Sequence, residues 1–261
     1  MSPRHVRDWS HVFLLIAIAS CKSGGERRES EPTPGLAVVL AARPPRIDGS
    51  LEDPAWRLAK STGSFVATRE GGPAAVEASA KLLWDDGYLY VGLEVQDPLL
   101  VAGHETRDAY LWEQDCVELM VDPKGDGKSY FEIEVSPRGT VFDTRFDARR
   151  APPPFGHVSW DSAARVGVTT RGEIDDDRAD AGYTVEIAIP WQAFSPEGAP
   201  ARPPASGEEW RANLYVLDLR RDGQRAAAWS PLGAGDFHVP HRFGSITFQG
   251  PERLESPEGP H

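Results

Sequence analysis

Two side chains suited to binding a sugar lie close together in residues 111–123, which read L-W-E-Q-D-C-V-E-L-M-V-D-P. From Asp115 onward the residues alternate, which predicts a strand with its valines and leucine on one face and Glu118 on the other. Trp112 stands just before this strand. Because the C–H face of a pyranose packs on an aromatic ring while its hydroxyls need polar partners, this pair predicts a sugar-binding site.

Paired carboxylates suggest a second chemistry, the hydrolysis of glycosidic bonds. The candidate pairs are Asp115 with Glu118 and Glu132 with Glu134. Glycosidases place their two carboxyl groups on either side of the scissile bond. Residues two or three apart on one strand lie near each other but do not face one another across a sugar ring. The sequence therefore favours binding, and we expect that the domain is not an enzyme.

The strands that would position these residues are short and evenly spaced. The turn Asp85-Asp86-Gly87 between two alternating runs is typical of a hairpin. Helical periodicity is almost absent, apart from single turns at residues 51–56 and 190–194. Strands are predicted at residues 36–42, 77–84, 88–95, 115–121, 129–136, 140–146, 163–171, 183–189, 209–219, 225–229 and 242–248. This pattern predicts an all-β fold, an antiparallel β-sandwich of jelly-roll type, over residues 36–250.

Five tryptophans are expected to be structural. Trp56 follows a capping acid and a proline, and we expect it to close one end of the core. Trp84, Trp191, Trp210 and Trp229 lie within apolar runs. These four are therefore predicted core residues.

The first 20 residues are predicted to be an export signal. Arg4 and Arg7 precede an apolar run at 12–19, which is too short for the roughly 20 residues that span a bilayer. The following Ile18-Ala19-Ser20-Cys21 resembles the lipobox of bacterial lipoproteins. This resemblance implies a lipid on Cys21 and a protein exported and anchored in the bacterial cell envelope. An ordinary cleaved signal followed by an incidental cysteine is the alternative.

Two polar segments flank the predicted domain. Residues 21–35 are rich in Gly, Ser and Pro and show no apolar periodicity. They are predicted to form a flexible tether between the lipidated Cys21 and the domain. Residues 251–261 are predicted to form a polar tail.

Charge and cysteine content narrow the possible partners. The net charge is −12 and no stripe of Lys or Arg is visible, whereas nucleic-acid binding needs a basic face. Nucleic acid is therefore not expected as a partner. The chain has two cysteines, and with Cys21 lipidated no disulfide can form. Cys116 is then predicted to be a small residue packed on a strand.

Five motifs, in this order, resemble carbohydrate-binding module family 9. They are I-D-G-S-L-E-D-P-A-W at 47–56, L-L-W-D-D-G-Y-L-Y-V at 82–91, W-E-Q-D-C-V-E-L at 112–119, Y-T-V-E-I-A-I-P-W at 183–191 and F-H-V-P-H-R-F-G at 237–244. Together they span nearly the whole predicted domain. The resemblance implies binding of a mono-, oligo- or polysaccharide, in support of polysaccharide breakdown by a separate glycoside hydrolase.

The resemblance also implies which residues bind the sugar. In the family two aromatic rings sandwich a terminal sugar, and here these rings are Trp112 and Phe237, the second smaller than the family's tryptophan. Glu118 takes the place of the family's hydrogen-bonding glutamate. Arg225, in G-Q-R at 223–225, also matches the family pattern.

Three other positions depart from the family. Glu134 and Ser136 stand where the family has cationic and amide ligands, and Tyr215 stands where it has a glutamine. The two rings remain while the residues that would contact hydroxyls are exchanged. The departures therefore imply a changed sugar specificity.

The resemblance implies no cofactor for binding but a structural calcium ion. Asp97 and Asp122 each follow a predicted strand, where carboxylate oxygens could converge on a hard cation. The alternative role for both residues is to cap a turn.

Two other functions stay open. One is a structural envelope lipoprotein with a vestigial sugar site. The other follows from the related DOMON-type sandwiches, which bind haem through Met and His ligands. The candidate ligands here are Met120, His104, His157, His238 and His241, although no haem attachment motif is present.

Overall fold

The structure is a computed structural model that describes residues 32–195 and 201–250. The predicted signal, Cys21 and the polar tail lie outside these ranges, as does most of the predicted tether. The described residues form β-strands and four short 3₁₀ helices. None of their helices is long and apolar enough to cross a membrane. The all-β class is therefore confirmed, while the jelly-roll arrangement stays a prediction.

The strands follow the sequence pattern closely. They are β1 (Gly35–Leu40), β2 (Val66–Ala67), β3 (Glu77–Trp84), β4 (Tyr88–Gln96), β5 (Cys116–Asp122), β6 (Tyr130–Val135), β7 (Val141–Phe146), β8 (Arg165–Thr170), β9 (Tyr183–Pro190), β10 (Glu209–Arg220), β11 (Gly223–Ala228) and β12 (Gly244–Gln249). The 3₁₀ helices are η1 (Pro54–Arg57), η2 (Leu111–Glu113), η3 (Trp191–Phe194) and η4 (Pro240–Arg242). Every predicted strand is present, and only the two-residue β2 was not predicted.

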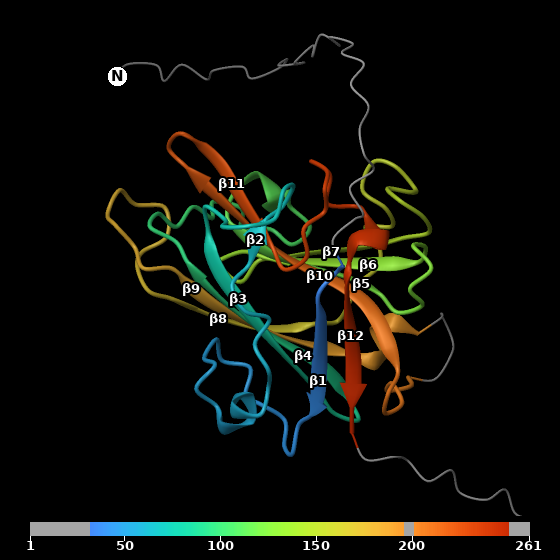
Figure 1. Ribbon diagram of the computed structural model, residues 1–261. Coiled ribbons are helices and arrows are strands. Elements are labelled where there is room, and N and C mark those ends of the chain that lie inside the picture. The colour runs from blue at the N-terminus through green and yellow to red at the C-terminus, as the bar shows by residue number, and fades with distance from the viewer. Residues whose placement is uncertain (1–31, 196–200, 251–261) are drawn as a thin grey trace, which may run out of the picture. The chain divides into compact units, whose positions relative to one another are not determined.

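One 12-stranded sheet runs through the domain. Its main path is β7-β6-β5-β10-β12-β1-β3-β4-β9-β8, and β11 and β2 pair beside β10. The neighbours are antiparallel except for β1, which runs parallel to both β12 and β3. Figure 1 shows β1 and β12 side by side, in blue and red. The first and last described strands thus join the two halves of the sheet.

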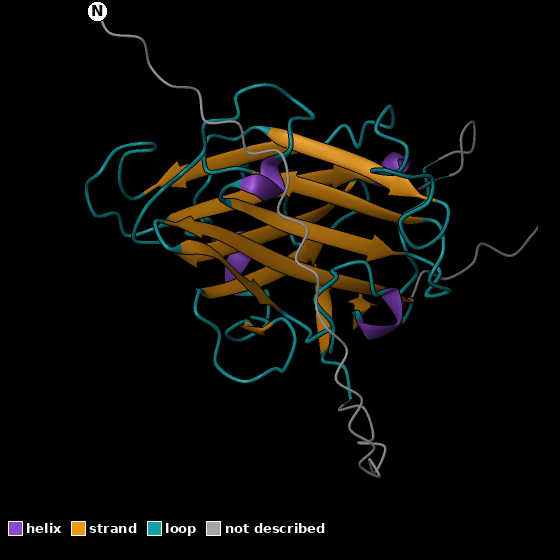
Figure 2. Ribbon diagram, turned by 90° about the horizontal axis from the view of Figure 1, so that it is seen from above, coloured by secondary structure: helices purple, strands orange, loops and turns teal. Residues whose placement is uncertain are grey.

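The sheet curls so that its two halves pack face to face (Figure 2). Val117 and Ile133, from β5 and β6, belong to the same buried cluster as Val91 and Ile187, from β4 and β9. These strands are not neighbours in the sheet, so their side chains meet across the interior. Each strand contributes every second residue, as the alternating pattern predicted.

The predicted core tryptophans lie in this interior. Trp84, Trp191, Trp210 and Trp229 are each at most 5% exposed and belong to the main core cluster. Around Phe248 the rings of Trp84, Trp191 and Trp210 pack edge to face at 5.8, 5.9 and 5.1 Å. This geometry is one that aromatic pairs prefer. The interpretation of all four as core residues is confirmed.

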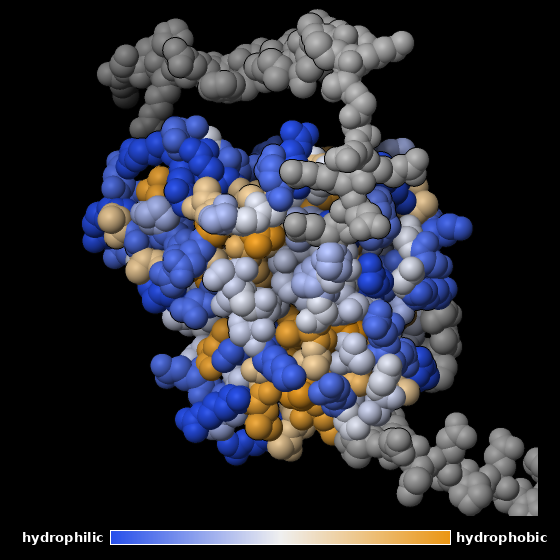
Figure 3. Space-filling view, viewed as in Figure 1, coloured by the Kyte–Doolittle hydropathy of each residue, from blue (hydrophilic) through white to orange (hydrophobic). Residues whose placement is uncertain are grey.

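One face of the described domain is mainly hydrophilic. Figure 3 shows hydrophilic residues over much of one face, with apolar patches between them. Among the described residues, the exposed large apolar residues are Leu58, Tyr110 and Val158, at 58%, 46% and 46%. Tyr110 lies beside Trp112, and the rings of these two residues stack.

Trp56 lies on the outer face of β3, β4 and β9. It is fully buried and packs with Leu83, Tyr90 and Ala188 in a cluster separate from the main core. The expectation that Trp56 closes one end of the core is therefore wrong. Its ring instead covers the opposite face of the sheet, where β3, β4 and β9 also need a partner for their apolar residues.

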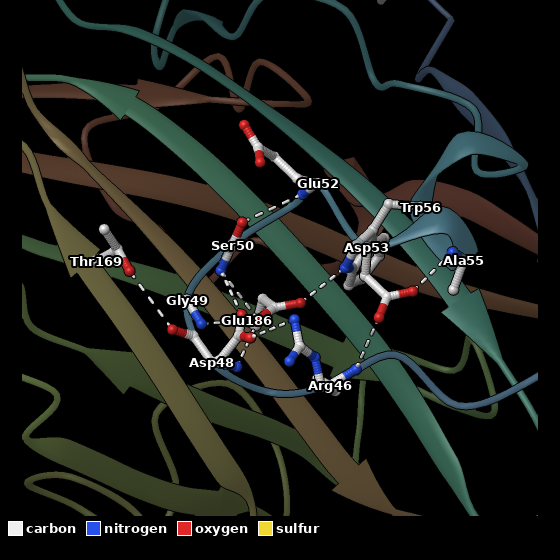
Figure 4. A network of polar contacts seen from close by, with 10 residues as sticks. All are labelled: Arg46, Asp48, Gly49, Ser50, Glu52, Asp53, Ala55, Trp56, Thr169 and Glu186. Atoms are coloured by element: carbon white, nitrogen blue, oxygen red, sulfur yellow. Dashed lines mark hydrogen bonds and ion pairs between the residues drawn. The ribbon is translucent and has the colours of Figure 1, made fainter.

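Glu186 holds the segment before Trp56 on this outer face (Figure 4). This glutamate of β9 is fully buried. One carboxylate oxygen accepts the backbone N–H groups of Asp48, Gly49 and Ser50 at 2.8, 2.8 and 3.2 Å. The other accepts the indole Nε1–H of Trp56 at 2.7 Å. A single carboxylate thus satisfies four donors from the I-D-G-S-L-E-D-P-A-W motif.

Two glycines allow this segment to lie directly on β8. Gly49 has a φ of 85°, and a Cβ atom there would lie 2.4 Å from the carbonyl carbon of Val168. A Cβ atom on Gly167 would lie 2.6 Å from the backbone nitrogen of Gly49. Both contacts are too short for any side chain, so these positions require glycine.

The other half of the sheet is also covered on its outer face. All seven residues of β5 are buried, including Cys116, which packs on a strand as predicted. Leu232, Val239 and Phe243 come from the segment between β11 and β12 and pack on Met120 of β5. The cover is incomplete toward η2, and the candidate site lies there.

Candidate carbohydrate-binding site

A cavity of about 170 Å³ lies over the outer face of β5, β6 and β7. Carboxylates from β5 and β6 and aromatic rings from β7, η2 and two loops line it. The carboxylates are those of Glu118, Glu132 and Glu134, and the rings are those of Trp112, Phe142, Phe146, Phe155 and Phe237. Pockets for drug-sized ligands hold roughly 300–1,000 Å³. This cavity therefore suits a small ligand, such as one sugar unit.

The strand register brings the carboxylates together. Glu118 on β5 pairs with Glu134 on β6, which in turn pairs with Phe142 on β7. Glu132 lies two residues before Glu134 on the same face and pairs with Met120. Residues directly opposite on antiparallel strands hold their Cβ atoms about 4.5–5.5 Å apart. Each of the three glutamates accordingly offers a carboxylate oxygen within 4.8 Å of the others.

The three carboxylates are buried and strongly perturbed. Glu118, Glu132 and Glu134 are 3%, 6% and 1% exposed. Burial and the neighbouring carboxylates raise the pKa of Glu118 and of Glu134 well above the usual range. Burial raises the pKa of Glu132 to about 7. The buried Oε1 of Glu118 has no hydrogen-bond partner among the described residues, so it is free to bind a donor on a ligand.

Trp112 is held at the edge of the cavity by the residues around η2. Asp115 accepts the backbone N–H groups of Val101 and Leu219. The carbonyl oxygen of Trp112 accepts the Nε2–H of Gln224, on β11, at 2.6 Å. The segment before β5 is thus tied to three other parts of the chain, and the position of Trp112 is fixed before any ligand binds.

The indole ring of Trp112 belongs to an aromatic group. It stacks on Tyr110 at 4.7 Å, lies 4.9 Å from Phe155 and contacts Phe142 edge to face at 5.1 Å. The Trp112 side chain is half-buried. These contacts restrict the ring's rotamers, so little conformational entropy remains to be lost when a ligand packs against it.

Phe237 enters the cavity from the segment between β11 and η4. Its ring stacks on Tyr215 at 4.4 Å, and its carbonyl oxygen accepts the hydroxyl of Tyr215 at 3.1 Å. Next to it, Asp236 accepts hydrogen bonds from Arg149 at 2.6 Å and from Arg150 at 2.7 Å. Burial opposes ionisation, but these bonds hold the pKa of Asp236 below its usual range. The two loops that border the cavity are therefore linked to each other.

Residues 47–251, which include the whole cavity, match the family model described as carbohydrate family 9 binding domain-like. The chain belongs to this family. The family resemblance of the sequence motifs is confirmed, while the lipoprotein part of that prediction is not tested by this match.

Relatives of this family 9 domain occur within much longer proteins. They include endo-1,4-beta-xylanase A of Thermotoga maritima (24% identical over 215 residues), endo-1,4-beta-xylanase C of Paenibacillus barcinonensis (33% over 210) and exoglucanase XynX of Acetivibrio thermocellus (30% over 213). The matches cover 81%, 77% and 79% of this chain but 18%, 16% and 16% of the relatives. The chain therefore spans less than a fifth of each of these proteins.

Solved structures share the fold of the family 9 domain. A protein from Bacteroides uniformis superimposes with a TM-score of 0.67 at 20% identity, covering 83% of this chain and 100% of its own. A family 9 module from Caldicellulosiruptor kristjanssonii, solved with cellotriose, has a TM-score of 0.57 at 21% identity, covering 87% and 98%. The same kind of module solved with glucose has a TM-score of 0.56. At these identities the likeness shows the fold alone.

The structure places three predicted site residues outside the cavity lining. Tyr215 lies beneath the ring of Phe237. Ser136 is buried, and its hydroxyl accepts the backbone N–H of Thr140 in the β6–β7 turn at 3.2 Å. Arg225 of β11 pairs with Asp218 in the register, and its guanidinium lies 2.7 Å from Asp222. Trp112, Glu118, Glu134 and Phe237 do line the cavity.

Nine lining residues were not assigned to a sugar site from the sequence, among them one glutamate and three phenylalanines. Glu132 and Phe142 follow from the β5–β6–β7 register once Glu118 and Glu134 are placed. The strands predicted at 129–136 and 140–146 could therefore have indicated both residues. Phe146 shares the face of Phe142 by the same alternation. Phe155 lies in an irregular loop after the proline run, where no periodic pattern indicates its direction.

The residues of the two alternative chemistries are separated or packed. Asp115 and Glu118 lie in different carboxylate clusters, so the structure does not bring this candidate acid–base pair together. Glu132 and Glu134 are neighbours on one strand of the cavity. Met120 packs in the apolar cluster between β5 and the covering segment. His238 lines the cavity, with its Nδ1 2.8 Å from the hydroxyl of Tyr130.

A second buried carboxylate cluster lies between the end of β4, the start of β5 and β10. It consists of Asp97, Asp115 and Asp218, with oxygens within 4.8 Å of one another. Burial raises the pKa of Asp97 to about 6 and that of Asp115 to about 8. Among the described residues, Arg220 pairs with Asp218 at 2.7 Å. One guanidinium therefore faces three carboxylates.

This second cluster fits a hard cation. Oδ2 of Asp97, Oδ1 of Asp218 and the hydroxyl of Tyr183 are buried and have no hydrogen-bond partner among the described residues. Calcium binds oxygen ligands of this kind, with a preference for several carboxylates. Asp122 lies elsewhere and caps the turn after β5, accepting the N–H groups of Gly125 and Gly127 at 2.9 and 2.7 Å. The structure therefore does not bring Asp97 and Asp122 to one site.

Proposed function

We propose that this family 9 domain binds carbohydrate without cleaving it, with a sugar ring against Trp112 and a hydroxyl hydrogen-bonded to Glu118. The unpartnered Oε1 of Glu118, in a cavity bordered by the half-buried Trp112, carries the proposal. Phe237 offers a second ring from another loop. A pre-positioned ring and an unused acceptor are what a sugar's C–H face and hydroxyl require.

We further propose that this binding assists polysaccharide breakdown by a separate glycoside hydrolase. The support is the occurrence of related domains within xylanases and an exoglucanase, of which each match covers a small part. Here the hydrolase would be another chain, held near its substrate by a shared glycan surface. Binding of both proteins to one glycan would raise the local concentration of the hydrolase near its substrate, as in tethered binding systems.

A titration of the soluble domain, residues 32–250, against mono- and oligosaccharides tests the binding proposal. We expect saturable binding, with a change in tryptophan fluorescence because Trp112 borders the cavity. The panel includes neutral, amino and acidic sugars and their oligomers, because the residues exchanged at 134, 136 and 215 imply a changed sugar specificity. Absence of binding throughout would contradict the proposal and support a structural envelope lipoprotein with a vestigial site. A Soret absorption band in the purified protein would support the haem alternative.

We also propose that Cys21 carries the lipid that anchors the chain in the cell envelope. Cys21→Ser should leave the protein unprocessed or soluble, because stable attachment needs more than one acyl chain and the mutant has none. Fractionation with an antibody against the domain measures this outcome. Cys116→Ser is the matched control, since this cysteine is buried in the domain, and it should stay in the membrane fraction. Membrane-bound Cys21→Ser protein of processed size would contradict the anchor.

A structural calcium ion is proposed at Asp97, Asp115 and Asp218, where it would neutralise the cluster and hold the segment that carries Trp112. A ligand at 100 times its Kd stabilises by about 2.7 kcal/mol. At roughly 2–4 °C per kcal/mol for a domain of this size, a chelator should lower the Tm by roughly 5–10 °C. Metal analysis should find one calcium ion per chain.

Two variants locate the calcium site. Asp97→Asn should abolish both calcium content and the effect of chelator on the Tm. Asp122→Asn should keep both, with only the loss of its turn hydrogen bonds. Calcium content lost in Asp122→Asn but kept in Asp97→Asn would place the ion at the other aspartate.

A further inference from the structure

The carboxylates of the sugar cavity lack a balancing cation within the described protein. Among the described lining residues the one guanidinium or ammonium group belongs to Arg150. Its Nε and Nη2 atoms lie 3.0 and 2.7 Å from Asp236, which also binds Arg149. His238 lies 3.9 Å from Glu132 but does not supply a charge, because burial lowers its pKa to about 4. Four carboxylates thus face two guanidinium groups.

A neutral sugar would leave this imbalance unchanged. A hydroxyl donates one hydrogen bond and carries no charge, so it can satisfy the unpartnered Oε1 of Glu118 but cannot offset three clustered glutamates. Clustered buried carboxylates hold protons at neutral pH unless a cation joins them. A protonated amino group has three donors and one positive charge, which matches three acceptors that converge within 4.8 Å.

The remaining lining favours an organic cation over a metal ion. Calcium takes six to eight oxygen ligands, whereas the lining here also includes the rings of Trp112, Phe142 and Phe155 and the side chain of Leu217. Aromatic faces attract ammonium groups and also pack against the C–H face of a sugar. At the aspartate cluster, by contrast, the unpartnered buried atoms are carboxylate oxygens and the hydroxyl of Tyr183.

We propose that the ligand of this cavity is an amino sugar, with its ammonium group among Glu118, Glu132 and Glu134 and its ring against Trp112. This inference rests on the proposed carbohydrate-binding function and specifies the class of sugar. It also accounts for Glu134, which stands where the family resemblance implies a cationic or amide side chain. A carboxylate at this position replaces a side chain that would bind hydroxyl groups with one that would bind an ammonium group.

Paired titrations at neutral pH test the proposal. Glucosamine is compared with glucose and with N-acetylglucosamine, and the glucosamine trimer with cellotriose, by calorimetry and tryptophan fluorescence. The amino sugars should bind at least about tenfold more tightly than their neutral counterparts, the size of one charge-assisted hydrogen bond. Saturating calcium chloride should leave the affinity for glucosamine unchanged.

Variants assign the preference to the carboxylates. Glu118→Gln and Glu134→Gln keep the side-chain volume and should bring the affinities for glucosamine and glucose close together. Glu113→Gln, on the same side of the domain but exposed and outside the cavity lining, should keep the preference. Melting curves establish that each variant is folded.

The outcomes separate this proposal from the broader one. Equal or tighter binding of glucose or cellotriose would overturn the amino-sugar proposal and leave carbohydrate binding in place. Displacement of glucosamine by calcium chloride would assign the three glutamates to a metal ion. Absence of binding to every sugar would overturn both proposals.

Discussion

Trp112→Ala is expected to abolish detectable carbohydrate binding. Aromatic stacking contributes about 0.5–1.5 kcal/mol beyond the area that the ring buries, and every 1.4 kcal/mol is tenfold in affinity. The indole also packs on Tyr110 and Phe155, so its removal loosens the wall that those rings form. For a small ligand of modest affinity, the combined loss exceeds the range of a titration. Calorimetry measures the affinity, and the fluorescence change on ligand addition should disappear.

Phe237 and Trp160 provide the comparison for this variant. Phe237→Ala should weaken binding less, because its ring is smaller, and Phe237→Trp should be neutral or tighter. Trp160 is half-buried but lies outside the cavity lining, so Trp160→Ala should leave the affinity unchanged. A sugar that binds the wild type and the Trp112→Ala protein equally would show that the ligand lies elsewhere.

Glu186→Ala is expected to lower the free energy of unfolding by about 3–5 kcal/mol, because removing one partner of a buried charged network leaves the others unpaired. The change leaves four N–H donors without their acceptor, three from the backbone of residues 48–50 and one from Trp56. Urea denaturation measures the loss. The Tm should fall with it, since each kcal/mol corresponds to roughly 2–4 °C in a domain of this size.

Two further variants test this explanation. Glu94→Ala removes an exposed carboxylate from the neighbouring strand β4 and should change stability by no more than about 0.5 kcal/mol. Glu186→Gln should be intermediate, because its carbonyl oxygen can still accept while its amide group faces donors. Folded Glu186→Gln protein should bind sugar normally, since the network lies on the outer face of β9, away from the cavity. A Glu186→Ala protein as stable as Glu94→Ala would contradict the role of the network.

The fold was predictable where a pattern belongs to one segment. The alternation in β5 and the Asp-Gly turn between β3 and β4 are local, and both predict strands directly. β2 has two residues, too few for any periodicity, and was missed. Trp56 was misplaced because a single apolar residue does not reveal which face of a sheet it covers. That choice depends on Glu186, 130 residues away in the chain.

The site was only partly predictable because it depends on register between strands. Glu118 and Glu134 could be named from the family resemblance, but their meeting with Glu132 requires the pairing of β5 with β6. Arg225 matched a motif, yet the register sets it opposite Asp218 and directs it away from the cavity. Asp97 was expected beside Asp122 because both end strands. Its neighbours are instead Asp115 and Asp218, which come from other parts of the chain.

The place of β1 between β12 and β3 sets the order in which this domain can be completed during synthesis. β1 leaves the ribosome before any other described strand, whereas its partner β12 follows about 200 residues later. Until residue 249 is made, β1 and β10 each lack a neighbour, and both present unpaired strand edges. Such edges promote aggregation, and long-range pairing of this kind is slow. A fragment trimmed to the family match at residue 47 would lack β1 altogether and keep β3 and β12 exposed permanently. Expression of this domain therefore needs a start before residue 35.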